Sequence, residues 1–314
     1  MRRPLLTSAL VLLALPLALG CNAKTAGAPE PLTVFAAGSL ARPLRAALDS
    51  IAATSGTSVR LEVMGSREML RAITSLGRTP DLVITADADE MERTLLPRYI
   101  AGSATFARNR VVLALSPHVN LAVEITTANW PDVLLRSDLR VARTDPARAP
   151  LGYRTQLVWA LTALTSGRPG LADSLMATAP AALMRGSEAD LAALLESGDA
   201  DAAWCYESLA RALHLRYVRL GDARDLGSAG DSALYRTVSV RVTGNAPGDS
   251  ITVAGSPIRY AMAIVTGSRR ADAAAALQVR LLDTSSRRIM RQFGLDVLDT
   301  LRVVTAVAPS VPAP

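Results

Sequence analysis

The sequence has few residues that could form a metal centre or act as a catalytic base. It contains two cysteines, Cys21 and Cys205, and two histidines, His118 and His214. No cysteine cluster, HExxH helix or Walker motif is present, so zinc chemistry and nucleotide hydrolysis lack their usual ligands. A serine hydrolase without a Gly-x-Ser-x-Gly elbow would need a histidine to meet a serine through the fold. We therefore expect no enzyme and no cofactor, with a hidden triad as the alternative.

Aromatic residues and basic runs are also scarce. Aromatic side chains make up 4% of the chain, and two of the charges behind the formal net charge of +6 come from Arg2 and Arg3 near the N-terminus. Few bases could stack on such a surface, so a nucleic-acid partner is not expected. Half of the residues are apolar and 20% are charged, which is typical of a globular protein. A length of 314 residues predicts two domains.

The N-terminal residues have the pattern of a secretory signal. Arg2 and Arg3 precede an apolar stretch over 5–19, which is shorter than the ~18–20 residues that span a bilayer. The stretch ends in Ala-Leu-Gly-Cys21, similar to the lipobox of bacterial lipoproteins. We expect a signal peptide over 1–21, lipidation at Cys21 and a tether over 22–30. The protein would then lie in the periplasm or on the cell surface, held to the membrane only by its lipid. A soluble secreted protein with an incidental cysteine is the alternative.

Strands and helices alternate along the rest of the chain, which predicts α/β architecture with parallel sheets covered on both faces. Apolar runs and alternation predict strands, and apolar spacing of three and four residues predicts helices. The predicted strands are 32–37, 59–63, 81–86, 111–115, 140–142, 201–206 and 260–265, and the predicted helices are 40–51, 69–76, 156–164 and 187–195. The Pro- and Ala-rich end, 306–314, is predicted to be a disordered tail.

Two serines follow predicted strands at equivalent positions. Ser39 and Ser66 each come after a strand and a glycine and directly before a helix. Free backbone N–H groups and the positive end of the helix dipole meet there, which favours an anion. Ligands of parallel sheets bind beyond the carboxyl ends of strands, so both turns could face one ligand. The alternative is that both serines are ordinary N-caps.

Several collinear motifs resemble the molybdate/tungstate-binding proteins of ABC transporters, and they cover roughly residues 32 to 295. The Gly-Tyr-Arg-Thr-Gln and Phe-Ala-Arg-Asn stretches are most similar to the tungstate-binding branch. The motifs are Leu32-Thr-Val-Phe-Ala-Ala-Gly-Ser-Leu40, Asp81-Leu-Val-Ile-Thr-Ala-Asp87, Phe106-Ala-Arg-Asn109, Val111-Val-Leu-Ala114, Asp145-Pro146, Pro150-Leu-Gly-Tyr-Arg-Thr-Gln156, Leu191-Ala-Ala-Leu-Leu-Glu-Ser-Gly198 and Asp201-Ala-Ala-Trp-Cys-Tyr-Glu-Ser208.

This resemblance implies a type II periplasmic-binding-protein fold, in which two α/β lobes joined by crossing hinge strands close around a cleft. Lobe 1 would comprise 31–113 plus 256–305, and lobe 2 would comprise 114–255. The resemblance also implies the oxyanion donors, which are the hydroxyls of Ser39, Ser66 and Tyr206 and the backbone near Leu151 and Glu188. A monomer that captures molybdate or tungstate and delivers it to a permease and its ATPase is expected.

Two positions depart from the tungstate-binding branch. Ala149 and Cys205 stand where that branch has carboxylates that add ligands to the metal, and neither Asp145 nor Glu207 is placed to replace them. We therefore expect a tetrahedral oxyanion held by hydrogen bonds alone. Coordination by the Cys205 thiolate and contact of Arg67 with the anion are weaker alternatives to a buried cysteine and a solvated arginine. Sulfate binding, or an exported sensor lipoprotein of the same fold, is the alternative function.

Overall fold

The structure is a computed structural model that describes residues 30–136, 138–243 and 248–306. The predicted signal peptide, Cys21, almost all of the predicted tether and residues 307–314 of the predicted tail lie outside the described residues. Lipidation at Cys21 and disorder of the tail therefore stay predictions. Among the helices that the structure describes, none combines the length and the apolar character needed to cross a bilayer.

The first sheet is mixed and has the strand order β13-β4-β12-β3-β1-β2. Its strands are β1 (Leu32–Ala37), β2 (Val59–Met64), β3 (Leu82–Thr85), β4 (Gly102–Arg108), β12 (Arg259–Ile264) and β13 (Asp296–Thr305). Strands β1, β2 and β3 are parallel, whereas β12, β4 and β13 run antiparallel to their neighbours. The parallel sheets predicted from the sequence are therefore wrong for the C-terminal strands, and they are also wrong for residues 111–115 of the second sheet, which pair antiparallel with 202–206 and 217–219. Strand β12 enters the sheet from the opposite end because the chain returns there from the other half of the molecule, and β13 then runs in the same direction as β12.

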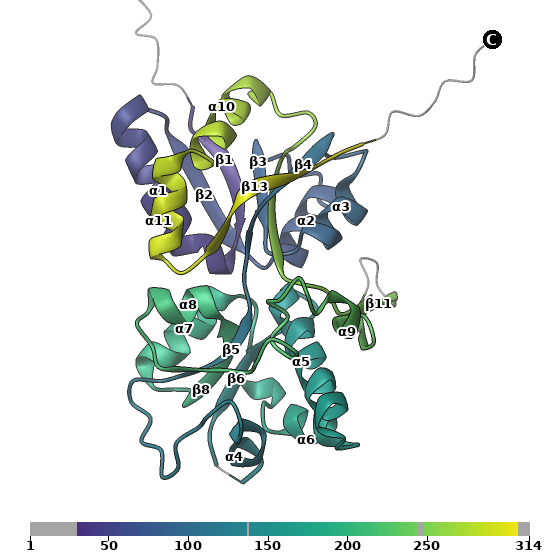
Figure 1. The fold of residues 1–314 in the computed structure, drawn as a ribbon. Helices are drawn as coiled ribbons and strands as arrows, with labels where there is room; N and C mark the ends of the chain where they lie inside the picture. The colour runs from purple at the N-terminus through teal and green to yellow at the C-terminus, as the bar shows by residue number, and fades with distance from the viewer. Residues whose placement is uncertain (1–29, 137, 244–247, 307–314) are drawn as a thin grey trace, which may run out of the picture. The chain divides into compact units, whose positions relative to one another are not determined.

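Helices cover both faces of this sheet (Figure 1). They are α1 (Ala41–Ser55), α2 (Ser66–Thr74), α3 (Ala88–Leu95), α10 (Ala271–Leu281) and α11 (Thr284–Gln292), with a 3₁₀ turn, η1 (Gly38–Leu40), before α1. Helices α1, α10 and α11 pack on one face, and α2 and α3 bury Met69, Ile73 and Met91 against the other. Burial of both faces accounts for the nearly continuous apolar sequence of β1 and β3.

The second sheet has the strand order β7-β6-β8-β5-β9. Its strands are β5 (Val111–Leu115), β6 (Val141–Thr144), β7 (Met184–Arg185), β8 (Ala202–Tyr206) and β9 (Tyr217–Arg219). Its helices are α4 (Trp130–Arg136), α5 (Pro150–Ser166), α6 (Leu171–Ala177), α7 (Glu188–Ser197) and α8 (Glu207–Ala212), with a 3₁₀ turn, η2 (Ala181–Leu183). Trp204 of β8 lies edge-on to Trp130 and Trp159, and these large rings fill the core of this lobe.

The chain passes between the two sheets twice. Strand β4 ends at Arg108 and β5 begins at Val111, so the chain changes sheet at Asn109 and Arg110. It returns through α9 (Ser232–Tyr235) and the hairpin of β10 (Ser239–Thr243) and β11 (Ser250–Ala254), which precede β12. The two crossings touch where the Asn109 amide donates to the Tyr260 hydroxyl over 3.0 Å. The two α/β lobes are thus joined by a hinge, and the exact lobe boundaries given by the resemblance stay a prediction.

Helix α5 was predicted from its apolar spacing, but it is longer than predicted at its N-terminal end. The apolar spacing predicted a helix over 156–164, but α5 begins at Pro150. Proline at the first helical position lacks only an N–H that would be unpaired there, and its fixed φ suits the helix. Helix α7 follows its prediction closely, because Ser187 and Asp190 form a capping box and Gly198, at φ 78°, ends the helix.

Candidate functional site: a cavity between the lobes

The structure brings the predicted oxyanion residues together around one small cavity between the lobes. Ser39, Ser66, Leu151, Glu188 and Tyr206 all line it, and each is at most 6% exposed. Ala37, Gly38, Gly65, Ala86, Ala149, Pro150 and Ser187 complete the lining. The volume open to the centre of a water-sized sphere is about 10 Å³, which is space for about one water molecule. The role of these residues as ligands stays a prediction.

Lobe 1 contributes two serines that do not act as N-caps. Ser66 is the first residue of α2, and its Oγ accepts a hydrogen bond from the Ala86 N–H over 3.1 Å, at the end of the neighbouring β3. Ser39 lies in η1, and its Oγ accepts from the Tyr260 hydroxyl over 2.9 Å. Each hydroxyl oxygen thus accepts from the protein and leaves its own hydrogen to donate, and the Ser39 hydroxyl interacts with the Glu188 carboxyl group at the cavity.

Lobe 2 contributes the first turns of two helices. Leu151 is the second residue of α5 and Glu188 is the first residue of α7. N–H groups of a first helical turn have no partner within the helix, and the dipole makes this end positive. Ser66 and the 3₁₀ turn η1 of lobe 1 lie across the cavity from these two turns. A negative charge between the lobes would therefore be stabilised from both.

The Glu188 carboxyl group also faces this cavity, a role that the sequence analysis did not foresee. Its Oε1 accepts from the Tyr206 N–H over 3.0 Å, while Oε2 is buried and has no hydrogen-bond partner among the described residues. Burial raises the pKa of Glu188 to about 7, although the Tyr206 N–H, Ser39 and Arg154 oppose that shift. Near neutral pH this carboxyl group can therefore be neutral and donate a hydrogen bond.

Tyr206 is held in place by Arg154. The guanidinium of Arg154 donates to the Tyr206 hydroxyl over 2.6 Å, donates to the Ala86 carbonyl oxygen over 2.6 Å and lies 3.4 Å from an Asp87 carboxylate oxygen. Burial raises the pKa of Tyr206 well above its usual range, so the hydroxyl stays neutral. Its proton can point into the cavity, because Arg154 occupies the oxygen as a donor.

The lobes approach each other so closely at Gly65 that no side chain fits at this position. A Cβ atom on Gly65 would lie 2.3 Å from the Arg148 carbonyl oxygen of lobe 2. That oxygen accepts from the N–H groups of Arg67 and Glu68 over 3.1 and 3.3 Å. The first turn of α2 is therefore docked on the loop before α5, which is the arrangement of a closed interlobe cleft.

Arg67 differs from its prediction. It was expected to be solvated on the first turn of α2, but it is 1% exposed. It pairs with Glu90 over 2.8 Å and donates to the carbonyl oxygens of Pro146 and Thr243. Its first-turn position lies at the lobe interface rather than at the surface, so it holds the lobes together and does not line the cavity.

The other side chains that were weighed as ligands lie elsewhere. The Asp145 carboxylate accepts from the Ala147 N–H over 2.8 Å, and Glu207 pairs with Arg110 and Arg219. Cys205 points from β8 into the hydrophobic core, and burial raises the pKa of its thiol well above the usual value. Neither His118 nor His214 lines the cavity, so a serine there has no histidine base beside it.

Three further residues support the site, and sequence reasoning gave them no role. Tyr260, Asn109 and Arg154 form the hydrogen bonds behind Ser39 and Tyr206. Asn109 and Arg154 lie within motifs that carried the resemblance, which was the available signal. Tyr260 had none, because a tyrosine in an apolar strand is indistinguishable from core until its hydroxyl partner is known.

Comparisons with known proteins agree with this architecture. The profile of the family described as bacterial extracellular solute-binding protein matches residues 32–296. A Haloferax volcanii protein provisionally named ABC transporter molybdenum-binding protein is 36% identical, over 83% of this chain and 79% of its own length. The molybdate/tungstate-binding protein WtpA of Thermococcus kodakarensis is 27% identical, over 94% of this chain and 91% of its own.

A solved structure shares the fold. The periplasmic molybdate-binding protein of Azotobacter vinelandii superposes with a TM-score of 0.57 at 17% identity, over 84% of this chain and 98% of its own. It has the two-lobed periplasmic-binding-protein architecture that the two sheets and the hinge show here. The match over nearly the whole described chain, together with this fold, shows that the protein belongs to the bacterial extracellular solute-binding protein family.

Proposed function

We propose that this protein captures molybdate or tungstate in the cavity between its lobes and delivers it to an ABC permease and its ATPase. One observation carries the proposal: hydroxyl groups and first helical turns from both lobes converge on a cavity that no arginine or lysine lines. Neutral donors and helix N-termini suit an anion without an exchangeable proton. The names of the two relatives indicate which anion, since one is provisionally named a molybdenum-binding protein and the other is named a molybdate/tungstate-binding protein.

Ligand capture requires the lobes to move. The closed cavity has room for about one water molecule, so a five-atom oxyanion enters only when the lobes separate and then contacts donors on both sides. A ligand that bridges the lobes favours the closed state by its extra contacts there. Small-angle scattering should therefore show a more compact protein with saturating tungstate, and an unchanged profile would contradict the bridging role.

The Glu188 carboxyl group sets how the anion is held. In its neutral form it donates to one oxygen of the oxyanion, and the ionised form would repel a dianion. Tungstate affinity should therefore fall as pH rises through about 7, the pKa of Glu188. The variant Glu188→Gln keeps a donor in all conditions and should lose this pH dependence.

The decisive experiment measures anion selectivity and coordination together. Calorimetry should rank molybdate and tungstate alike, sulfate weaker because it is smaller, and monohydrogen phosphate weakest. A phosphate proton facing donors would leave a buried O–H unpaired, at a cost of about 1–3 kcal/mol. X-ray absorption on the tungstate complex should show four oxygen neighbours. Absence of molybdate and tungstate binding would overturn the function, and extra ligands would overturn only the hydrogen-bonded mode.

Export and anchoring belong to the same proposal. The family is extracellular, and the leader ending at Cys21 supports delivery to the outer face of the membrane. Intact-mass spectrometry of protein purified from membranes should find an acylated Cys21 as the first residue. An unmodified Cys21, or cleavage beyond it, would remove the lipid anchor and leave a freely exported protein.

A further inference from the structure

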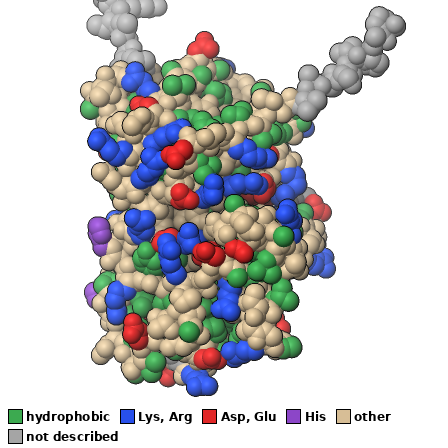
Figure 2. Space-filling model, in the orientation of Figure 1, with side chains coloured by type: hydrophobic (Ala, Val, Ile, Leu, Met, Phe, Trp, Pro, Cys, Tyr) green, Lys and Arg blue, Asp and Glu red, His purple; other side chains and the backbone are tan. Residues whose placement is uncertain are grey.

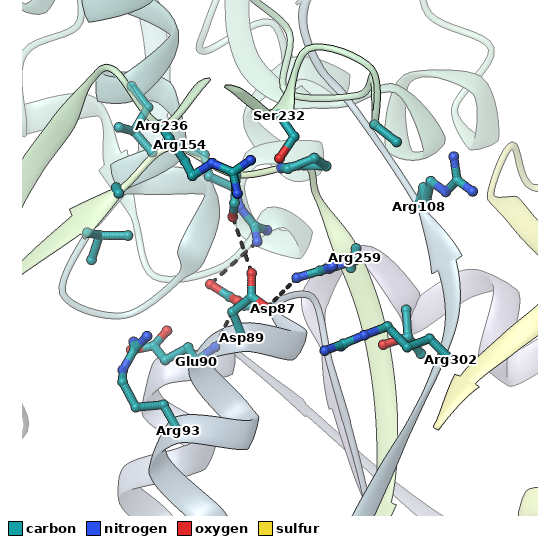
Figure 3. A pocket seen from close by; sticks show the side chains of 18 of the residues that line it. Asp87, Asp89, Glu90, Arg93, Arg108, Arg154, Ser232, Arg236, Arg259 and Arg302 are labelled. Atoms are coloured by element: carbon teal, nitrogen blue, oxygen red, sulfur yellow. Dashed lines mark hydrogen bonds and ion pairs between the residues drawn. The ribbon is translucent and has the colours of Figure 1, made fainter. Parts of the chain in front are cut away.

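A second and much larger cavity lies beside the oxyanion cavity at the lobe interface (Figure 3). Its volume is about 850 Å³, which is within the range of pockets that hold small organic molecules. The two cavities share no lining residue, but Arg154 lines the large one while its guanidinium bonds to Tyr206 of the small one. We call this second space the arginine cavity.

Arginine dominates its charge. Six arginines line the cavity against three acidic residues. The arginines are Arg93, Arg108, Arg154, Arg236, Arg259 and Arg302, and the acidic residues are Asp87, Asp89 and Glu90. Figure 3 shows the labelled arginines arranged around Asp87 and Asp89, with Arg154 and Arg236 above the aspartates in this view and Arg93 below. Cationic groups thus reach the space from several directions.

The acidic residues do not neutralise this charge. Asp87 pairs with Arg154, Asp89 pairs with Arg259, and Glu90 pairs with Arg67 outside the cavity. Arg302 is neutralised by Glu92, which does not line the cavity. Within the part of the chain that the structure describes, Arg93, Arg108 and Arg236 make no side-chain hydrogen bond or ion pair. Arg93 and Arg236 are exposed and Arg108 is half-buried, so these guanidinium donors face solvent and are available to a ligand, while Glu90 attracts Arg93 electrostatically.

The fold leaves this space open by breaking a strand pairing. Strand β13 pairs with β4 at Val297 and again at Arg302, and between these positions its register shifts. Residues 298 and 300–302 line the cavity at this irregularity, and Thr252, Val253 and Ala254 of the β11 end line it from the hairpin. Leu157, Val253 and Leu301 add apolar surface that a bare inorganic ion would not use.

We propose that the arginine cavity binds a small organic anion with at least two carboxylate groups. Free guanidinium groups come from both lobes, because Arg93 lies on α3 and Arg236 follows α9. A ligand with one charged group could meet only one side, whereas separated carboxylates can pair with both. The planar guanidinium binds carboxylate through two parallel hydrogen bonds, and the apolar wall accommodates the carbon chain. A phosphate ester could use the same donors, so the test separates the two.

The experiment titrates purified protein with citrate, with pyrophosphate and with propane-1,2,3-tricarboxamide, the last being a neutral organic control. Calorimetry is performed with the oxyanion cavity empty and again with saturating tungstate. Citrate should bind in both conditions, the tricarboxamide should not bind, and pyrophosphate should bind more weakly because it lacks the carbon chain. Citrate affinity should also fall with added salt, since free charges are screened.

Matched variants locate the binding. Arg93→Ala combined with Arg236→Ala should weaken citrate about tenfold or more, the scale of a lost charge-assisted hydrogen bond, and leave tungstate binding unchanged. Arg45 and Arg60 are exposed and line neither cavity, so Arg45→Ala with Arg60→Ala removes the same charge and should leave citrate affinity unchanged. Thermal melting establishes that both double variants fold.

Four outcomes would overturn the inference. They are no citrate binding at millimolar concentrations, citrate displaced by tungstate one for one, equal losses in the two double variants, and pyrophosphate bound more tightly than citrate. The inference does not rest on the proposed oxyanion function. Failure of tungstate to bind, with citrate still sensitive to Arg93 and Arg236, would remove the function and leave the arginine cavity.

Discussion

The two cavities at the lobe interface differ in the groups that they would present to an anion. The oxyanion cavity presents hydroxyls and first helical turns with no lysine or arginine, and about 10 Å³ is free in it. The arginine cavity has six arginines and about 850 Å³. Neutral donors fixed by the backbone select a small ion by shape and by its lack of protons, whereas flexible charged side chains accept larger ligands of varied shape. The two cavities thus differ in volume and in the kind of donor that lines them, and not only in charge.

Charges on the molecular surface are mixed, whereas arginines outnumber acidic residues in the arginine cavity. Figure 2 shows Arg side chains spread over this face with Asp and Glu side chains among them. No single sign dominates the visible face, in agreement with the absence of basic runs in the sequence. Unpaired arginines gathered in a cavity are therefore more informative than the formal net charge of +6.

The largest expected effect is on stability and comes from the buried Arg154–Asp87 ion pair, whose arginine lies between the two cavities. Arg154 is 3% exposed and Asp87 is 6% exposed, and Tyr153 also donates to Asp87. Arg154→Met would leave the Asp87 carboxylate buried without its cation, so the free energy of unfolding should fall by about 3–5 kcal/mol. Urea unfolding measures this.

An exposed ion pair serves as the control for Arg154. Arg140 pairs with Asp201 over 2.8 Å and is half exposed. Arg140→Ala should lower the free energy of unfolding far less than Arg154→Met, because solvent screens exposed pairs. Equal losses of unfolding free energy in the two variants would show that the buried Arg154–Asp87 pair contributes no more to stability than an exposed pair.

The second effect is the pH dependence that Glu188 gives to folding. The pKa of Glu188 is raised from 4.5 to about 7 by burial, so the folded state holds its proton more tightly than the unfolded state. Stability is therefore lost as pH rises from about 4.5 through about 7. Glu188→Gln should remove a penalty of up to about 3 kcal/mol above pH 7 and almost none at pH 4.5. Thermal melts of both proteins across this range without ligand measure the difference, and parallel curves would contradict it.

The third effect separates the cavities by ligand. Ser39→Ala and Ser66→Ala should each weaken tungstate binding by about 1.5–3 kcal/mol, the scale of a hydrogen bond to a charged group, and Tyr206→Phe should act similarly. None of these variants should change citrate binding. Calorimetry on each variant measures both, with exposed Ser75→Ala as the neutral control. Wild-type tungstate affinity in all three would place the oxyanion site elsewhere.

The smallest expected effect is on tungstate binding and comes from an exposed ion pair between the lobes, which we call the rim pair. Arg148 of lobe 2 pairs with Glu68 of lobe 1 over 2.9 Å, and both side chains are more than one third exposed. A double-mutant cycle with Arg148→Ala and Glu68→Ala should give a coupling of about 0.2–1 kcal/mol in tungstate binding, and 1 M salt should abolish it. A coupling that persists in 1 M salt would contradict the view that this pair is an exposed, screened contact.

Much of the fold could be read from the sequence because its signals are local. The strand over 32–37 has the predicted bounds, and Ser187 and Gly198 mark the ends of α7 as their chemistry requires. The serines after the strands are placed by the same turns that were visible in the sequence. The antiparallel entry of β12 and β13 was not visible, because strand direction depends on where a distant segment returns.

The sequence by itself determined the alternation of strands and helices and the turns that place Ser39 and Ser66 at the cavity. Apolar periodicity and capping act over a few residues, so they need no tertiary context. Only the tertiary structure decided that Arg67 is buried at the lobe interface, that the Glu188 carboxyl enters the cavity and that Tyr260 supports Ser39. Those roles depend on which side chain lies opposite across the lobe interface, and residues far apart in the chain meet there only after both lobes have folded.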